Sequence, residues 1–230
     1  MKILAFDTVN NSASVAISED KIILAYIEDL RPSMQAETIV PMIEEALRIA
    51  KLSYHDLNYL AVTNGPGSFT GIRVGLSVAK GILLSTNIIG TTISNFEYSW
   101  WRASKQVSNY NKNVTFKFFI FLNAYRGQLY SQVFDQDGHA SIPLLIDYDQ
   151  AVQLLNIEDN TIKVCAGSGI GMIYDKIKDL ENVMILPRFA RVKAWHICQY
   201  IADKIARKYN LSNSIEPLYI RLADVKIKQS

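Results

Sequence analysis

The stretch of this sequence whose residue types could do chemistry most directly is a glycine-rich segment, NGPGSFTG at residues 64–71. Glycines let backbone N–H groups come close to a ligand, and a helix N-terminus favours an anion. The segment lacks the ending of a Walker A loop and the third glycine of a dinucleotide fingerprint, and its proline removes one N–H donor. A tight strand-to-helix turn is therefore the favoured interpretation, in which an added Cβ would strain a glycine-only turn. Nucleotide or phosphate contact is the alternative, and its candidates are Gly65, Gly67, Ser68 and Thr70.

Asp7 and Thr8, which end the first apolar run of the chain, are a second candidate contact for a nucleotide or a phosphate. A carboxylate at a strand end can hold a magnesium-bound water or polarise a nucleophile. It can equally be a turn residue, which is its more usual role. A second glycine turn, GSGIG at residues 167–171, could border an adenosine or a phosphate, although one glycine turn is weak evidence.

The histidines and cysteines do not form a metal or nucleophile motif. His55, His139 and His196 lack the HExxH or HxxxH spacing of a metal site, and Cys165 and Cys198 form no CxxC pair. No serine or cysteine has a local signature such as GxSxG. We expect this chain to hold no metal, no disulfide framework and no catalytic residue.

Aromatic and basic clusters could contact nucleic acid. Trp100, Trp101 and Arg102 could stack bases, although core packing or a partner surface is the more usual role of such a cluster. Small basic groups around Arg188 and Lys226 are expected to be solvated. The net charge of +2 is too low for dedicated nucleic-acid binding, but transient contact with RNA through a local patch stays open.

The elements that must position these residues follow from apolar periodicity and turn chemistry. In the first half they are strands over 2–6, 13–18 and 21–27, a helix over 35–50, a strand over 57–63, a helix over 68–86 capped by Ser68, a strand over 88–92, and a helix over 94–101 capped by Ser94. The first three strands are joined by turns too tight for helical crossovers, so an antiparallel meander is expected.

The second half repeats this order of elements without sequence identity. Its elements are strands over 115–122, 127–134 and 142–146, a helix over 148–155, a strand over 161–166, a helix over 172–177, a strand over 183–186 and a helix over 192–209. The repeated order suggests a duplicated α/β lobe. A polar, aperiodic segment between the halves places the boundary, which predicts lobes of residues 1–108 and 109–230.

Composition sets the broad class of the protein. The chain has 230 residues, of which 49% are hydrophobic and 20% charged, as in globular proteins. Its longest apolar run is far shorter than the ~18 residues of a membrane span, and Asp7 comes too early for a signal-peptide core. We expect a soluble cytoplasmic protein without a membrane partner.

The helix predicted after the glycine segment has two apolar faces. One face runs from Phe69 to Leu83, and the other consists of Val74, Val78 and Ile82. A helix that is apolar on two faces is either fully internal or covers a partner.

Four segments together resemble the TsaB (YeaZ) family. They are MKILAFDT at the start, GPGSFTGIRVGLSVAKG at residues 65–81, LNAYRGQLY at 122–130 and PLYIR at 217–221. They occur in the order and spacing of that family, and the block GPGSFTGxRxG is highly specific. The resemblance implies a subunit for the tRNA modification N6-threonylcarbamoyladenosine. It also implies two duplicated lobes of the actin/hexokinase/Hsp70 type, with mixed sheets flanked by helices.

The resemblance further implies that this chain is a non-catalytic partner. TsaD would carry the metal and transfer the threonylcarbamoyl group to tRNA, and TsaE would be an ATPase, so ATP and metal are expected on the partners. Pairing with TsaD, or with a second copy, is expected through first-lobe helices, with tRNA reached through the complex. Small glycines would let a partner helix approach. The expected interface residues are Ile39, Met42, Gly71, Val74, Gly75, Val78 and Ile82.

Three positions depart from the family pattern. Gln35 stands where many relatives keep a histidine, which makes a metal site in the first predicted helix still less expected. Asn123 and Gln128 stand where the family usually has Asp and Glu. The two carboxylates of this locus are therefore neutral here, which removes the basis for a metal or nucleotide role of an acidic pair.

Two other functions compete with the non-catalytic subunit. An autonomous ATPase or phosphotransferase of the same superfold would use Asp7, Thr8 and the glycine turns as phosphate contacts. A glycoprotease-like peptidase is the third interpretation, and the missing metal histidines argue against it. Fold alone cannot separate these functions.

Overall fold

The computed structural model describes residues 1–10, 12–108, 110, 114–157, 159–186, 191–209, 211 and 213–221. Of the small basic groups, Arg188, Lys226 and Lys228 lie outside the described residues, whereas Arg191 is exposed and Lys193 is partly exposed. Within this part of the chain, no helix is long and apolar enough to cross a bilayer.

The first sheet is mixed and has five strands in the order β3-β2-β1-β4-β5. β1 pairs antiparallel with β2, and β2 with β3, whereas β4 and β5 add in parallel on the other side. The expected meander is therefore confirmed. Its strands are β1 (Lys2–Asp7), β2 (Ala13–Glu19), β3 (Ile22–Asp29), β4 (Tyr59–Thr63) and β5 (Ile89–Ile93).

The second sheet repeats this topology, with the order β10-β9-β6-β7-β8. β6, β7 and β8 are antiparallel, and β9 and β10 continue the sheet in parallel. Two mixed sheets with the same topology confirm the duplicated α/β order. The strands are β6 (Phe116–Asn123), β7 (Gln128–Phe134), β8 (Leu144–Asp147), β9 (Ile162–Ala166) and β10 (Val183–Ile185).

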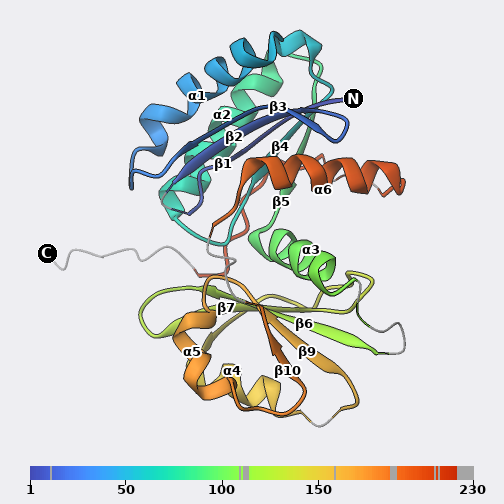
Figure 1. Cartoon of the computed structure of the whole chain (residues 1–230). Helices are drawn as coiled ribbons and strands as arrows, with labels where there is room; N and C mark the ends of the chain where they lie inside the picture. The colour runs from blue at the N-terminus through green and yellow to red at the C-terminus, as the bar shows by residue number, and fades with distance from the viewer. Residues whose placement is uncertain are drawn as a thin grey trace, which may run out of the picture.

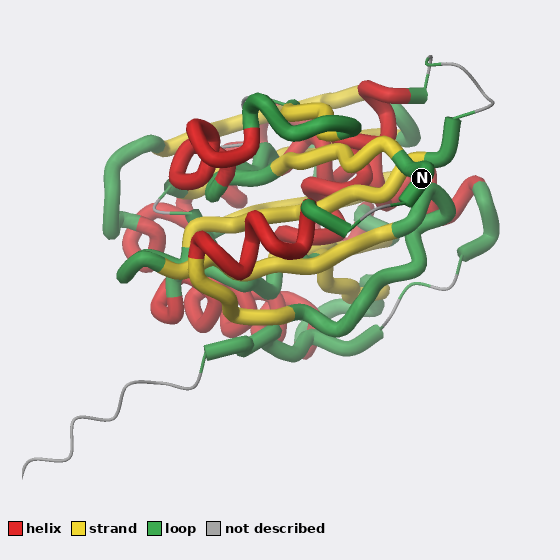
Figure 2. Tube along the Cα trace, turned by 90° about the horizontal axis from the view of Figure 1, so that it is seen from below, coloured by secondary structure: helices red, strands yellow, loops and turns green. Residues whose placement is uncertain are grey.

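Helices cover both faces of both sheets, so the molecule is built in layers (Figures 1 and 2). α1 and α2 cover the outer face of the first sheet, α6 and α3 lie between the sheets, and α4 and α5 cover the second sheet from outside (Figure 1). The helices are α1 (Gln35–Ala50), α2 (Phe69–Leu84), α3 (Asn95–Val107), α4 (Tyr148–Leu155), α5 (Ile170–Ile177) and α6 (Ala194–Ala206), with a 3₁₀ turn at Tyr54–Asp56.

The two central helices are exchanged between the halves of the sequence. α6, from the second half, buries Ile197 and Cys198 in one core with Ile3 of β1. α3, from the first half, buries Phe96 in the core of β6, with Phe118. The division into 1–108 and 109–230 stays a prediction, because each half supplies a helix to the sheet of the other.

Candidate functional site

Three of the segments that carry the family resemblance meet at one cleft. It has a volume of about 720 Å³ and lies between the loop after β4, the turn between β6 and β7, and the C-terminal residues 218–221. Gly67 and Ser68 line it, as do Asn123 and Tyr125 from the turn. The fold thus brings polar segments together that are distant in the sequence. Many of their polar groups already form hydrogen bonds with neighbouring protein groups.

The loop after β4 is held from two sides. The N–H of Ser68 donates to the carbonyl of Val9 (3.0 Å), and the Ser68 hydroxyl accepts from the N–H of Gly71 (3.2 Å), which makes Ser68 the expected cap of α2. Asn95 of α3 donates its backbone N–H to the carbonyl of Gly65 (2.7 Å) and its side-chain amide to that of Pro66 (2.8 Å). These contacts favour the turn interpretation. Thr70 is exposed but does not line the cleft.

Close packing explains three glycines at this junction. A Cβ on Gly67 would lie 2.4 Å from a methyl of Val9, one on Gly71 2.1 Å from the carbonyl oxygen of Thr8, and one on Gly75 2.5 Å from the Thr8 hydroxyl. These contacts correct the reasons that the sequence suggested for the glycines at positions 67, 71 and 75. Gly67 is not at positive φ, so contact, not backbone strain, requires it there. Gly71 and Gly75 let α2 approach its own lobe, not a partner helix.

Asp7 and Thr8 lie beneath the cleft and are fully buried. The Thr63 hydroxyl donates to Asp7 Oδ1 at 2.5 Å, the N–H of Val9 donates to the same oxygen at 3.3 Å, and Thr8 donates to the carbonyl of Gly71 at 2.7 Å. Asp7 Oδ2 has no hydrogen-bond partner among the described residues. Burial raises the pKa of Asp7 from 3.8 to about 6, against the lowering effect of its hydrogen bonds. Neither residue lines the cleft, so neither touches a ligand held there in this conformation.

Asn123 and Gln128 have structural partners as neutral residues. Asn123 Oδ1 accepts the N–H of Tyr125 at 2.8 Å and so shapes the turn between β6 and β7. Gln128 accepts from the guanidinium of Arg221, which also donates to the carbonyl of Ala124 at 3.1 Å. Arg221 therefore clamps the C-terminal segment onto this turn.

The C-terminal segment also bonds to the first half of the chain, which residue patterns did not predict. The N–H of Leu218 donates to the carbonyl of Asn64, and the Asn64 amide donates to the carbonyl of Glu216, both at 2.9 Å. Tyr219 packs on Phe69, with ring centroids 5.2 Å apart. The segment thus ties the loop after β4 to the second sheet. Only the family resemblance had singled it out.

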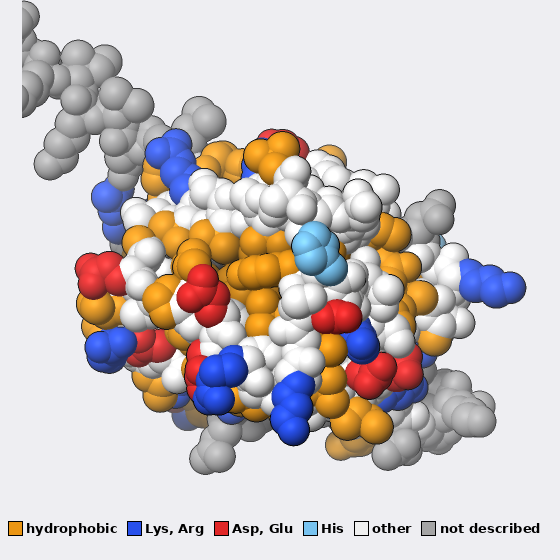
Figure 3. Space-filling view, turned by 90° about the horizontal axis from the view of Figure 1, so that it is seen from above, with side chains coloured by type: hydrophobic (Ala, Val, Ile, Leu, Met, Phe, Trp, Pro, Cys, Tyr) orange, Lys and Arg blue, Asp and Glu red, His pale blue; other side chains and the backbone are white. Residues whose placement is uncertain are grey.

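The residues expected to meet a partner divide into a buried group and a partly exposed group. Among the expected interface residues, Val74, Val78 and Ile82 are partly exposed, whereas the other four, Ile39, Met42, Gly71 and Gly75, are buried in their own lobe. Leu84, at the end of the same helix, is 90% exposed. Figure 3 shows the side that carries α1 and α2, with hydrophobic side chains gathered across its centre and charged side chains beside and below them. We call the partly exposed residues Val74, Val78 and Ile82, with Leu84 and Gly81, the outer face of α2.

Gly81 differs from the other glycines of α2. A Cβ built on it has no atom within 4 Å. Glycine inside a helix costs about 1 kcal/mol relative to alanine, and no contact with a described residue requires it at this position. Among the described residues, no group of three or more His, Cys, Asp or Glu side chains could hold a metal ion. The two cysteines are buried, and burial raises both thiol pKa values to about 12, which makes them poor nucleophiles.

Comparisons with known proteins find relatives in threonylcarbamoyladenosine biosynthesis. The family model described as TsaD, tRNA N6-adenosine threonylcarbamoyltransferase, matches residues 34–139. A "tRNA threonylcarbamoyladenosine biosynthesis protein TsaB" from Buchnera aphidicola subsp. Baizongia pistaciae is 30% identical over 95% of this chain and 97% of its own. The Escherichia coli protein of that name is 33% identical over 60% of this chain and 56% of its own, so the chain spans about half the length of some relatives.

The solved structures support the fold. "YeaZ from Pseudomonas aeruginosa" superposes with a TM-score of 0.73 at 17% identity, covering 95% of this chain and 99% of that one. The ethanolamine utilization protein EutJ from Carboxydothermus hydrogenoformans has a TM-score of 0.51 at 9% identity, over 86% and 89% of the two chains. These likenesses and the two repeated sheets confirm the two-lobed actin/hexokinase/Hsp70 type of fold.

Proposed function

The chain belongs to the TsaB family of tRNA threonylcarbamoyladenosine biosynthesis proteins, and on that premise we propose that it is a partner subunit of TsaD. In this role it supports the formation of N6-threonylcarbamoyladenosine next to the anticodon, in the cytoplasm, and carries out no group transfer itself. ATP and metal would be held by the partner proteins TsaD and TsaE, and tRNA would be reached through the complex.

The buried state of Asp7 supports a non-catalytic role. An autonomous phosphotransferase would need this carboxylate, or Thr8, at the ligand. Both are fully buried and hydrogen-bonded within the lobe, and the loop after β4 uses the Ser68 N–H to hold Val9. The packing of Asp7 and Thr8 and the hydrogen bonds of the loop after β4 therefore support a structural role for these groups.

The outer face of α2 carries the proposal for partner docking. Val74, Val78 and Ile82 are partly exposed on this helix, and Leu84 is almost fully exposed. Gly81 leaves open space beside them, where a helix of TsaD could come close. A second copy of the chain could use the same face, so a homodimer would compete with TsaD for it.

The decisive experiment reconstitutes the modification. The purified chain is mixed with TsaD, TsaE, tRNA and a source of the threonylcarbamoyl group, and N6-threonylcarbamoyladenosine is measured. Product should appear only when this chain and TsaD are both present, and the chain alone should not turn over ATP at about 1 per second or faster. Full activity of TsaD without the chain, or such turnover by the chain alone, would contradict the proposal.

A charge on the outer face locates the interface. Val78→Glu should weaken TsaD binding at least tenfold, because an unpaired carboxylate in a buried interface is costly. Gln153→Glu, at an exposed position of α4 on the outside of the second sheet, is the matched control and should bind as the parent does. Melting temperature is measured on the same samples. If Val78→Glu unfolds, Gly81→Leu replaces it, since a side chain there meets only open space in the isolated chain.

A further inference from the structure

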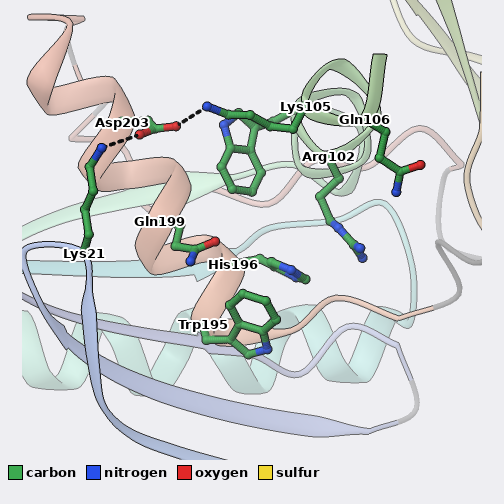
Figure 4. Close-up of a pocket in the computed structure, with 9 residues that line it drawn as sticks. Lys21, Arg102, Lys105, Gln106, Trp195, His196, Gln199 and Asp203 are labelled. Atoms are coloured by element: carbon green, nitrogen blue, oxygen red, sulfur yellow. Dashed lines mark ion pairs between the residues drawn. The ribbon is translucent and has the colours of Figure 1, made fainter. Parts of the chain in front are cut away.

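A second pocket lies where α3 and α6 run side by side between the two sheets. It has a volume of about 370 Å³, which is within the range of small-molecule sites, and Lys21 from the turn between β2 and β3 closes one side (Figure 4). Its aromatic and basic side chains come from three separate parts of the sequence. They are Trp101, Trp195 and His196, and Lys21, Arg102 and Lys105.

The aromatic wall offers flat surfaces to a ligand. The rings of Trp195 and His196 lie against each other, with centroids 3.5 Å apart, and Trp101 meets His196 edge-on at 6.4 Å. Trp195 is partly exposed, so one part of its indole remains open to solvent. Aromatic faces of this kind stack nucleobases with little dependence on base identity.

The cationic wall carries more positive than negative charge. Asp203 accepts from Lys105 at 2.8 Å and pairs with Lys21 at 3.6 Å. One carboxylate therefore holds two ammonium groups in place, and Arg102 adds a third cation beside the His196 ring (Figure 4). The Lys105 side chain is 47% exposed, and its ammonium lies 5.7 Å from the centre of the Trp101 ring, within reach of an anion that enters the pocket.

His196 adds an uncharged polar ring between these walls. Burial, with the nearby charges of Arg102 and Lys193, lowers its pKa to about 3, so the ring is uncharged at neutral pH. Tyr98 Oη accepts the N–H of Lys193 at 3.1 Å and lies 3.0 Å from His196 Nδ1. Tyr98 Oη also lies 3.5 Å from the carbonyl oxygen of Arg191, so its proton can point to either acceptor. The Nε2 atom of the neutral His196 ring is accordingly a donor or an acceptor for a ligand, depending on the tautomer.

We propose that this pocket binds a nucleotide, with the base against Trp195 and the phosphate beside Lys105 and Arg102. The amides of Gln106 and Gln199, which also line the pocket, can bond the edge of a base. The nucleotide is either free or one unit of a single-stranded RNA, since both present the same base and phosphate. This site goes beyond the proposed function and lies apart from the outer face of α2.

The test uses the full chain alone, titrated with three probes: adenosine monophosphate, a five-nucleotide oligoadenylate RNA and inorganic phosphate. Tryptophan fluorescence and calorimetry report binding. If adenosine monophosphate binds as tightly as the oligoadenylate, the ligand of the pocket is a free nucleotide. If only the oligoadenylate binds, the ligand is a single-stranded RNA. Dissociation constants of both above about 1 mM, or phosphate binding as tightly as the nucleotides, would overturn the proposal.

Variants separate this pocket from general charge effects. Trp195→Leu keeps apolar packing and should weaken nucleotide binding about tenfold. Lys105→Gln should weaken nucleotide binding several-fold. It should also reduce the slope of log affinity against log salt concentration by about 1, because one cation that contacts phosphate is lost. Lys176→Gln is the control, because Lys176 is also bonded to an aspartate and is 50% exposed, but lies on α5. If both lysine variants bind nucleotide with the same affinity and their melting temperatures are unchanged, nucleotide does not bind in the pocket between α3 and α6.

Discussion

The inner and outer faces of α2 use the same residue type in opposite ways. On the inner face, Gly71 and Gly75 touch Thr8 so closely that no Cβ fits. The buried carboxyl of Asp7 precedes Thr8, at the end of β1. On the outer face, Gly81 has open space where its Cβ would be. A glycine in a helix therefore does not by itself indicate a partner surface, because only the environment of its Cβ distinguishes internal packing from an open surface.

The largest effect is expected at the inner face. Gly71→Ala puts a Cβ 2.1 Å from the Thr8 carbonyl oxygen, and backbone atoms of two elements must move to admit it. We expect a loss of about 3 kcal/mol or more in the free energy of unfolding, measured by urea denaturation. A variant as stable as the parent would show that the junction of β1 and α2 is not tightly packed.

Asp7→Asn tests the buried carboxyl at the same junction. The folded-state pKa is raised to about 6, so the folded protein binds a proton more tightly than the unfolded chain. The stabilisation is fully present below about pH 4 and is lost as the pH rises through 6, by about 2–3 kcal/mol. The neutral amide should remove this loss, so the variant should gain stability over the parent between pH 4 and pH 7. Parallel pH profiles of the two proteins would contradict the raised pKa.

Gly67→Ala should have an intermediate effect. The new Cβ meets a methyl group of Val9 at 2.4 Å, which can rotate away, and the Val9 carbonyl oxygen at 2.9 Å, a smaller overlap than the 2.1 Å at Gly71. We expect a loss of about 1–2 kcal/mol, read from the melting temperature. If the loss matched that of Gly71→Ala, the loop after β4 would be as rigid as the helix it precedes.

Gly81→Ala has the smallest effect and the opposite sign. Alanine replaces glycine in a helix with open space around it, so stability should rise by about 1 kcal/mol. The same substitution at Gly71 is its matched control. Affinity for TsaD should fall in the stabilised variant, since a methyl group would occupy the space left for a partner. Unchanged affinity would move the interface away from this part of α2.

Local patterns predicted most of the secondary structure. The apolar spacing over 35–50 predicted α1 with the observed bounds, and Ser68 and Ser94 were identified as caps that accept N–H groups from Gly71 and Glu97. α3 extends to Val107, beyond the predicted end at Trp101, because α3 continues across the second sheet and buries Ala103 and Val107 in its core. Its last two turns are therefore stabilised by contacts with residues distant in the sequence.

The order of elements, the turns and the family could be predicted from the sequence, because those depend on residues close together in the chain and on recognisable segments. Three-dimensional packing was needed to show that α3 and α6 lie between the sheets, that Asp7 is buried while Asn123 lines the cleft, and that Trp101 and Trp195 share a pocket. It also decided which glycines of α2 face Thr8 and which face solvent. Helical spacing shows which residues share a face, but the direction of that face depends on long-range packing against the sheet.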